Sequence, residues 1–100
     1  MTALASAPNV VCKVGALCNY DAVLGYGAWS PAAVAQYAKE CFALFGARRC
    51  MWESNLPTDL LVGDFAARTA AMLEAARAVS SSSVELDCFF HDNALRVYRI

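Results

Sequence analysis

Two stretches of the sequence are almost continuously apolar. The run from Val10 to Leu17 contains one charged residue, Lys13. The run from Cys50 to Ser54 is apolar as far as Trp52 and polar after it. Short continuous apolar runs are typical of strands that are covered on both faces, as in a parallel sheet. The pattern therefore predicts two buried strands.

The segment between these strands has the clearest helical pattern, over Ser30–Phe45. Ser30 is suited to cap the amino end, Pro31 to occupy the first helical position and Gly46 to end the helix. One apolar stripe recurs with helical spacing, and its members are Val34, Tyr37, Ala38, Cys41, Phe42 and Phe45. A strand, a helix and a second strand predict one parallel βαβ unit with a right-handed crossover.

Two more helices are predicted after the second strand. Asp64 can cap a helix over Phe65–Val79, which carries apolar residues on one face. After a run of four serines, Ser82 and Glu85 have the spacing of a capping box for a last helix over Ser83–Tyr98. The expected fold class is α/β, a parallel βαβ unit followed by two helices.

A long loop joins the first strand to the first helix, and it is rich in aromatic residues. Tyr26 and Trp29 lie in it, between Gly25 and Pro31. Two interpretations remain open for these rings: they line the wall of a binding pocket, or they pack the loop onto the body of the domain.

Composition indicates that this sheet needs further cover. Hydrophobic residues make up 59% of the 100 residues, although small domains have much surface to cover with polar groups. Two apolar strands also leave their edges open. We therefore expect either self-association through the open sheet or a larger parent domain. The segment Ala3–Pro8 fits the end of a preceding helix as well as a true amino terminus, so truncation is suspected.

Charge and cysteine content exclude several classes of partner. The net charge is −1, and Arg48-Arg49 is the largest basic group, so nucleic acid is not expected. No apolar run approaches the roughly 18 residues that span a bilayer, and no secretory signal is visible. The five cysteines are odd in number and lack a C-x-x-C spacing. Reduced structural cysteines and a cytoplasmic location are the expectation.

Three motifs carry a resemblance to a known family. "PNVVCKVGAL", "FGARRCMWESNLP" and "HDNALRVYRI" follow one another over Ala3–Ile100. In this order they resemble the C-terminal portion of the amidohydrolase-related family, which are metal-dependent hydrolases and decarboxylases on a (β/α)8 TIM barrel. The resemblance implies that residues 1–100 are an incomplete part of that barrel domain, a fragment with strands seven and eight plus helices.

The resemblance also implies chemistry that these residues do not contain. In this family histidine ligands hold a divalent metal, with zinc as the first expectation. His91 is the only histidine in this sequence. No metal site is expected for this chain alone. A Cys88-x-x-His91 pair supplies two ligand types, where a zinc site usually needs four ligands.

Asn55 occupies the place of the Asp that usually ends strand eight in this family. An amide cannot act as a base, but it can hydrogen-bond a substrate. The resemblance places Asn55 as the catalytic-site residue and Ser54, with Tyr26 and Trp29, as substrate-binding residues at the mouth. The alternative for Asn55 is a turn residue ahead of Pro57.

Three charged residues near the same motif have structural interpretations. Asp59 could supply a carboxylate if its loop folds back, but a solvated or turn-capping Asp is favoured. If Ser54 faces the barrel interior, Glu53 faces the helices and pairs with a cation. Lys13 either anchors a substrate or keeps its charged head in water.

The parent function is then hydrolysis or decarboxylation of a small organic acid, lactone or amide. Whether this chain is itself an enzyme stays open, and alone it is expected to be inactive. The alternative is a non-catalytic remnant or interaction module that is stable only on association.

Overall fold

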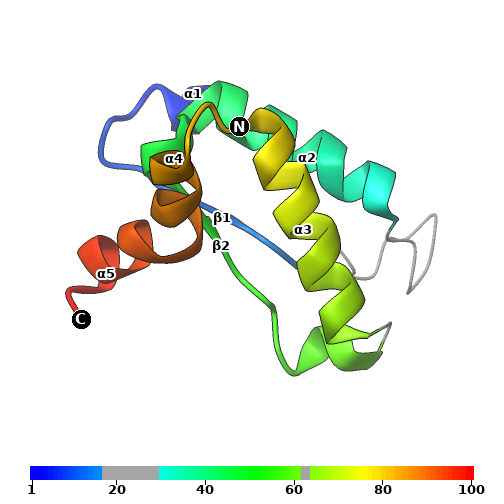
Figure 1. Cartoon of the computed structure of the whole chain (residues 1–100). Coiled ribbons are helices and arrows are strands. Elements are labelled where there is room, and N and C mark those ends of the chain that lie inside the picture. The colour runs from blue at the N-terminus through cyan, green and yellow to red at the C-terminus, as the bar shows by residue number, and fades with distance from the viewer. Residues whose placement is uncertain (17–29, 62–63) are drawn as a thin grey trace.

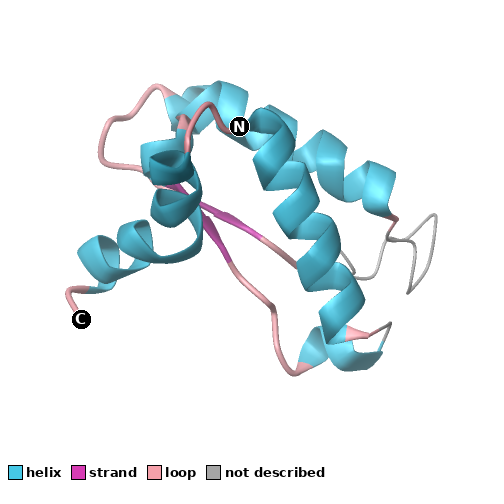
Figure 2. Cartoon of the chain, viewed as in Figure 1, coloured by secondary structure: helices cyan, strands magenta, loops and turns pink. Residues whose placement is uncertain are grey.

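A computed structural model describes residues 1–16, 30–61 and 64–100. Helices pack around a two-stranded parallel sheet in these ranges, as Figures 1 and 2 show. The elements in order are α1 (Thr2–Ala5), β1 (Cys12–Val14), α2 (Pro31–Phe45), the 3₁₀ turn η1 (Ala47–Arg49), β2 (Cys50–Trp52), the 3₁₀ turn η2 (Thr58–Leu61), α3 (Phe65–Val79), α4 (Ser83–Asp87), the π-helical turn η3 (Cys88–Asp92) and α5 (Asn93–Tyr98). No helix in the described ranges is long and apolar enough to cross a membrane.

The predicted βαβ unit is confirmed. Strands β1 and β2 pair in parallel, with Cys12 opposite Cys50 and Val14 opposite Trp52, and α2 lies between them in the chain. Both strands are shorter than predicted. A ladder exists only where the two strands run side by side, and its last bond joins the Glu53 amide to the Val14 carbonyl at 3.2 Å.

The helix starts follow the predicted capping chemistry. The Ser30 hydroxyl accepts a hydrogen bond from the Ala33 amide at 3.2 Å, and Pro31 opens α2. The Asp64 carboxylate likewise accepts from the Ala67 amide at 3.0 Å. Gly46 closes α2 with φ 73°, a conformation that glycine adopts without strain. These caps depend on residues within one turn, which is why sequence spacing predicts them.

One face of the sheet and the two long helices enclose the core. Helices α2 and α3 pack against each other, and α2 also contacts both strands (Figure 1). Alternation along β1 buries the side chains of Cys12 and Val14 and exposes Lys13. The buried cluster consists of Ala5, Cys12, Val14, Val34, Ala38, Phe45, Cys50, Met72, Ala75, Ala76 and Phe89.

The last predicted helix, Ser83–Tyr98, is interrupted by a π-helical turn. Its start is as predicted, since the Ser82 hydroxyl accepts from the Glu85 amide at 3.4 Å. Over η3 the backbone widens, which inserts one residue into the helix. The turn brings Phe89 and Phe90 together, with ring centroids 4.9 Å apart, and Phe90 packs against Trp52 at 5.8 Å.

Candidate functional site

The carboxyl ends of the two parallel strands lie at the same end of the sheet. Gly15 and Ala16 follow β1, and the segment from Glu53 to Asn55 follows β2. Ala16 and Asn55 both have positive φ, 54° and 53°, so the chain turns sharply at each strand end. Asparagine tolerates this left-handed conformation better than most residues.

Asn55 is bound to Asp59 through both main chain and side chain. Its Nδ2 donates to Oδ1 of Asp59 at 2.6 Å, and the Asp59 amide donates to the Asn55 carbonyl at 3.2 Å. Both interpretations of Asn55 thus have support: it shapes a turn before Pro57, and it lies at the strand end where the resemblance places the site.

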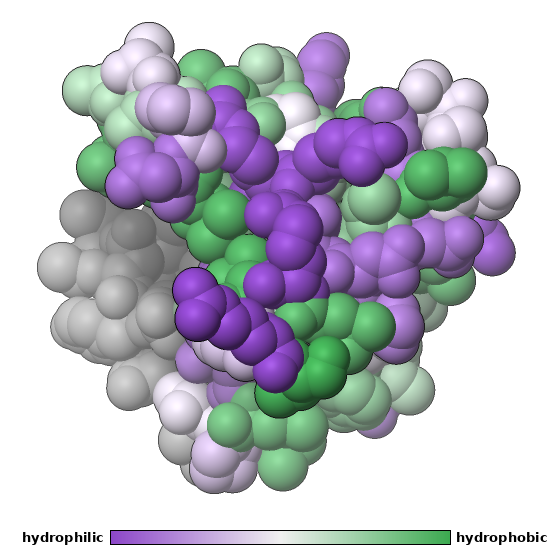
Figure 3. Space-filling model, turned by 90° about the vertical axis from the view of Figure 1, so that its left-hand side faces the viewer, coloured by the Kyte–Doolittle hydropathy of each residue, from purple (hydrophilic) through white to green (hydrophobic). Residues whose placement is uncertain are grey.

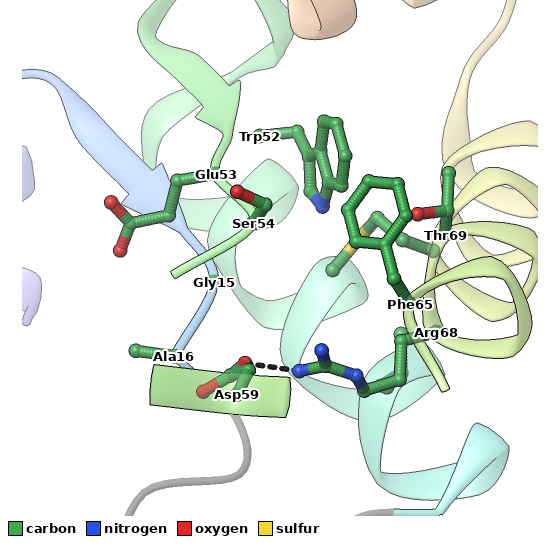
Figure 4. Close-up of a pocket in the computed structure, with 11 residues that line it drawn as sticks. Gly15, Ala16, Trp52, Glu53, Ser54, Asp59, Phe65, Arg68 and Thr69 are labelled. Carbon is green, nitrogen blue, oxygen red and sulfur yellow. Dashed lines mark ion pairs between the residues drawn. The ribbon is translucent and has the colours of Figure 1, made fainter. Parts of the chain in front are cut away.

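Asp59 is buried, which corrects the expectation of a solvated or turn-capping residue. Only 4% of it is exposed, and Oδ2 lies 2.5 Å from Nη1 of Arg68, as the dashed line in Figure 4 marks. Arg68 reaches from α3, and its side chain is 10% exposed. A buried carboxylate is tolerated when a cation and hydrogen bonds compensate its lost hydration. The loop therefore folds back, as the less favoured interpretation required.

Arg68 was not predicted as a site residue, although the sequence contains a signal for it. Counting along α3, Arg68 shares a face with Met72 and Ala75, at i+4 and i+7, and both are buried. A charged residue on a buried helical stripe needs a partner of opposite charge nearby. The missing information was which carboxylate the loop before α3 supplies.

A small cavity lies beside this charge pair. Its walls are Gly15, Ala16, Val34, Trp52, Glu53, Ser54, Asp59, Phe65, Arg68, Thr69 and Met72. Its volume is about 30 Å³, which holds one or two water molecules; ligand pockets usually measure about 300–1,000 Å³. Oγ1 of Thr69 is buried without a hydrogen-bond partner among the described residues. The cavity thus suits ordered water rather than a substrate.

Ser54 lines this cavity, and the other predicted wall residues cannot be placed. The Leu56 amide donates to the Ser54 hydroxyl at 3.4 Å, a local turn contact. Tyr26 and Trp29 lie outside the described residues. Of the four predicted site residues, the structure brings Ser54 and Asn55 to the same strand end.

Glu53 pairs with Lys13, whose side chain points to the opposite sheet face from those of Cys12 and Val14. Its Oε2 is 2.5 Å from Nζ of Lys13, whose side chain is half exposed. The predicted pairing with a cation is confirmed, but the predicted direction is wrong, because Lys13 alternates with the buried Cys12 and Val14. The hydrogen bond and charge of Glu53 raise the pKa of the Lys13 ammonium.

Four cysteines fall in the described residues, and all are free thiols. Cys12 and Cys41 approach to 3.8 Å between their sulfurs, and the Cys50 thiol donates to the Cys41 carbonyl at 3.4 Å. The hydrogen-bonded Cys12 thiol and partial burial raise the pKa of Cys41 far above its usual range. These thiols serve as core packing, as predicted.

The described residues at this strand end do not form a metal site. Asp59 directs its two carboxylate oxygens to Asn55 and Arg68, so its charge is already balanced. Within the described ranges no three His, Cys, Asp or Glu side chains come close enough to hold a metal ion. Any metal of the parent family would need ligands from outside this set of residues.

Comparison with known proteins places the chain in one family. The amidohydrolase family model matches residues 1–100. An uncharacterized protein of Sinorhizobium fredii, y4mH, is 36% identical over all 100 residues. The crystal structure of an amidohydrolase from Burkholderia multivorans with bound HEPES superposes on 99% of the chain with a TM-score of 0.83 and 22% identity.

The match covers only part of each relative. The chain spans about a third of their lengths, 31% of the rhizobial protein and 34% of the crystallised amidohydrolase. The α/β arrangement is therefore similar to part of an amidohydrolase barrel. Because the family model matches from the first residue to the last, this chain belongs to the amidohydrolase family.

Proposed function

We propose that the chain forms the last part of an amidohydrolase barrel and supplies one wall of its active site. The reaction is hydrolysis or decarboxylation of a small organic acid, lactone or amide. The supporting observation is the position of Asn55 just after the end of β2, where it is bonded to Asp59 of η2. In (β/α)8 barrels the reacting groups lie at the carboxyl ends of strands, and β1 and β2 would then be strands seven and eight.

Asn55 contributes binding and orientation to this reaction. Its amide does not ionise near neutral pH, so it cannot take a proton from water. It can hold a substrate group by hydrogen bonding, which fixes the reacting atoms in place. The proposal includes a divalent metal, for which zinc is the first candidate. This metal and its histidine ligands belong to the part of the barrel outside these 100 residues.

Reconstitution of the barrel tests this function. The chain is co-expressed with the part of the rhizobial relative that the match leaves uncovered. The purified pair is assayed with zinc on a panel of lactones, amides and carboxylic acids. We expect turnover of at least one class and a loss of about tenfold or more in kcat/KM in Asn55→Ala, the cost of one hydrogen bond.

The control variant is Gln36→Ala. Gln36 is exposed on α2, where its side chain bonds to Glu40, and its replacement should leave kcat/KM unchanged. A pair that assembles, melts cooperatively and turns over no member of the panel would count against the enzyme proposal.

A second candidate is a non-catalytic module that acts through association. Each strand has one edge without a partner strand among the described residues, and open edges can pair with another chain. Large apolar side chains are also exposed near the carboxyl end: Leu95, Tyr98 and Ile100. Figure 3 shows hydrophobic patches interspersed with hydrophilic side chains on the face toward α5.

Sedimentation velocity separates the two candidates. The association proposal expects the isolated chain to form oligomers whose size grows with concentration. A monomer that unfolds in one sharp transition over the whole concentration range would contradict it.

A further inference from the structure

Three thiols meet in the core where α2 packs against the sheet. Cys12 of β1 and Cys50 of β2 lie opposite each other in the parallel ladder, and Cys41 belongs to α2. The sulfurs of Cys12 and Cys41 are 3.8 Å apart, although the two residues are 29 positions apart in the chain. A disulfide joins its sulfurs at about 2.05 Å, so closing this pair requires a movement of less than about 2 Å.

The geometry favours a bond between Cys12 and Cys41 over a bond to Cys50. The ladder holds Cys12 and Cys50 on neighbouring strands, which lie about 4.8 Å apart, whereas a disulfide brings its Cβ atoms to about 3.8 Å. The Cys50 thiol also donates to the Cys41 carbonyl at 3.4 Å, so its proton is directed to the backbone. Cys41 approaches Cys12 from the helix that covers the strands, and the ladder does not hold it away.

Exposure gives the two thiols different roles. Cys41 is partly exposed on α2, whereas only 7% of Cys12 is exposed. A small reagent in solution therefore meets Cys41 first, and Cys12 lies behind it in contact with the sulfur that has reacted. The hydrogen bond with Cys12 and partial burial raise the pKa of the Cys41 thiol. The pair therefore stays protonated and reacts slowly, which calls for a reagent in excess.

We propose that Cys12 and Cys41 form a disulfide when the chain meets a small disulfide oxidant, such as oxidised glutathione. The Cys41 thiolate attacks one sulfur of the oxidant, which breaks the S–S bond and releases one reduced thiol. The Cys12 thiolate then attacks the Cys41 sulfur of this mixed disulfide and displaces the second thiol. The chain loses two protons and two electrons, the oxidant gains both, and the new bond ties β1 to α2.

The position of the cross-link is the first test. The reduced chain is incubated for hours with excess oxidised glutathione in mildly alkaline buffer. Remaining thiols are alkylated, and the peptides are identified by mass spectrometry without reduction. We expect a cross-link between the peptides that carry Cys12 and Cys41, and an alkylated Cys50. A cross-link to Cys50 as the main product of the folded chain, or no cross-link within the chain, would overturn the inference.

The unfolded chain supplies the reference for this pairing. In concentrated urea the contacts of the core are lost, and shorter loops close at a lower entropic cost. The main cross-links should then join cysteines that are closer in the chain, such as Cys41 and Cys50. Equal abundance of the Cys12–Cys41 bond in both states would show random pairing and contradict the proposal. If the isolated chain does not melt cooperatively, the co-expressed pair serves as the folded sample.

Alanine variants separate the outer thiol from the inner one. In Cys12→Ala the second step is missing, so Cys41 should accumulate a glutathione adduct. In Cys41→Ala the cross-link should be absent. Cys88→Ala is the matched control, because Cys88 is also 7% exposed, and it should keep the cross-link at an unchanged rate. A folded Cys12→Ala variant whose Cys41 stays unmodified would refute the proposed order of attack and, with it, the site.

The bond should also stabilise the fold, because it restricts the unfolded chain. The melting temperature should rise by about 10 °C on oxidation and return to its first value after reduction with dithiothreitol. Cys41→Ala, treated in the same way, should show no rise. A lower melting temperature in the oxidised chain would mean that the bond distorts the core, and it would overturn the inference. None of these measurements requires turnover, so their outcome is independent of the proposed function.

Discussion

Asn93 donates a hydrogen bond of 2.6 Å to the carbonyl of Cys50, and this contact links the last helix to the start of β2. The same Nδ2 atom donates to the Ala47 carbonyl at 2.7 Å, and only 2% of Asn93 is exposed. The asparagine of the third sequence motif is thus a structural residue, since it satisfies two backbone acceptors at the entry to the strand.

Asn93→Ala should lower the free energy of unfolding by about 2–3 kcal/mol, because it leaves buried carbonyl groups without a donor. Urea denaturation followed by circular dichroism measures this change. Asp92→Ala, at the exposed neighbour, should have little effect. Equal stability of the two variants would contradict the assigned role of Asn93.

Arg49 joins the amino-terminal segment to the end of α2. Its guanidinium donates to the carbonyls of Ala5 and Ala7 at 2.9 Å, and its Nε donates to the Phe45 carbonyl at 3.1 Å. Arg49→Met should destabilise the chain by about 2 kcal/mol, since bonds from a charged donor exceed ordinary ones. Amide exchange should show residues 2–7 losing protection first.

The exposed neighbour Arg48 offers a matched control. Arg48→Met removes the same charge and should leave the exchange of residues 2–7 unchanged. If both variants released the amino-terminal segment equally, net charge rather than the Arg49 contacts would hold it.

Alkaline pH should destabilise the fold through its thiols. The contact with Cys12 and partial burial raise the pKa of Cys41 in the folded state, so the unfolded chain releases this proton first as pH rises. The stabilisation is complete below the unfolded pKa of about 8.5 and declines above it. In reducing buffer the free energy of unfolding should be flat from about pH 6 to 8 and should fall above about pH 9.

Cys41→Ala checks the source of this slope. The variant should lose part of the decline above pH 9, whereas Ala43→Ser, at an exposed position of α2, should keep it. One proton can change the free energy of unfolding by at most about 1.4 kcal/mol per pH unit. Since Cys41 is only partly buried, its contribution to the slope should stay below this limit. Identical slopes in both variants would assign the decline to other groups.

Gly15 is required by the close approach of the two strand ends. A Cβ atom on Gly15 would lie 2.2 Å from Cγ and 2.4 Å from the backbone oxygen of Glu53. Gly15→Ala should therefore cost about 1–3 kcal/mol, the usual range for overpacking. Adding Glu53→Ala should recover only part of this loss, because the backbone contact remains; full recovery in a thermal melt would contradict the prediction.

Local chemistry made much of this fold predictable from sequence. Ser30, Asp64 and Ser82 each cap a helix through the amide three residues on, and Gly46 ends α2. Strand lengths were less predictable, because a strand lasts only as long as its neighbour runs beside it. The π-helical turn likewise depends on packing between η3 and β2.

The charge pair after β2 could not be predicted from the sequence. The resemblance directed attention to Asn55, yet the burial of Asp59 depends on Arg68, which arrives from another helix. Sequence alone gave no means to pair these two charges across the intervening turn. The direction of Glu53 was wrong for a similar reason, since its partner Lys13 lies on the neighbouring strand.

The widened turn over Cys88–Asp92 determines which way the side chains of the following helix, α5, point around its axis. Each residue advances an α-helix by about 100°, so deleting one residue from this turn would rotate α5 by about that angle about its axis. Asn93 would then swing away from the two carbonyls at the start of β2. The two hydrogen bonds of Asn93 therefore fix the length of this segment to the single residue.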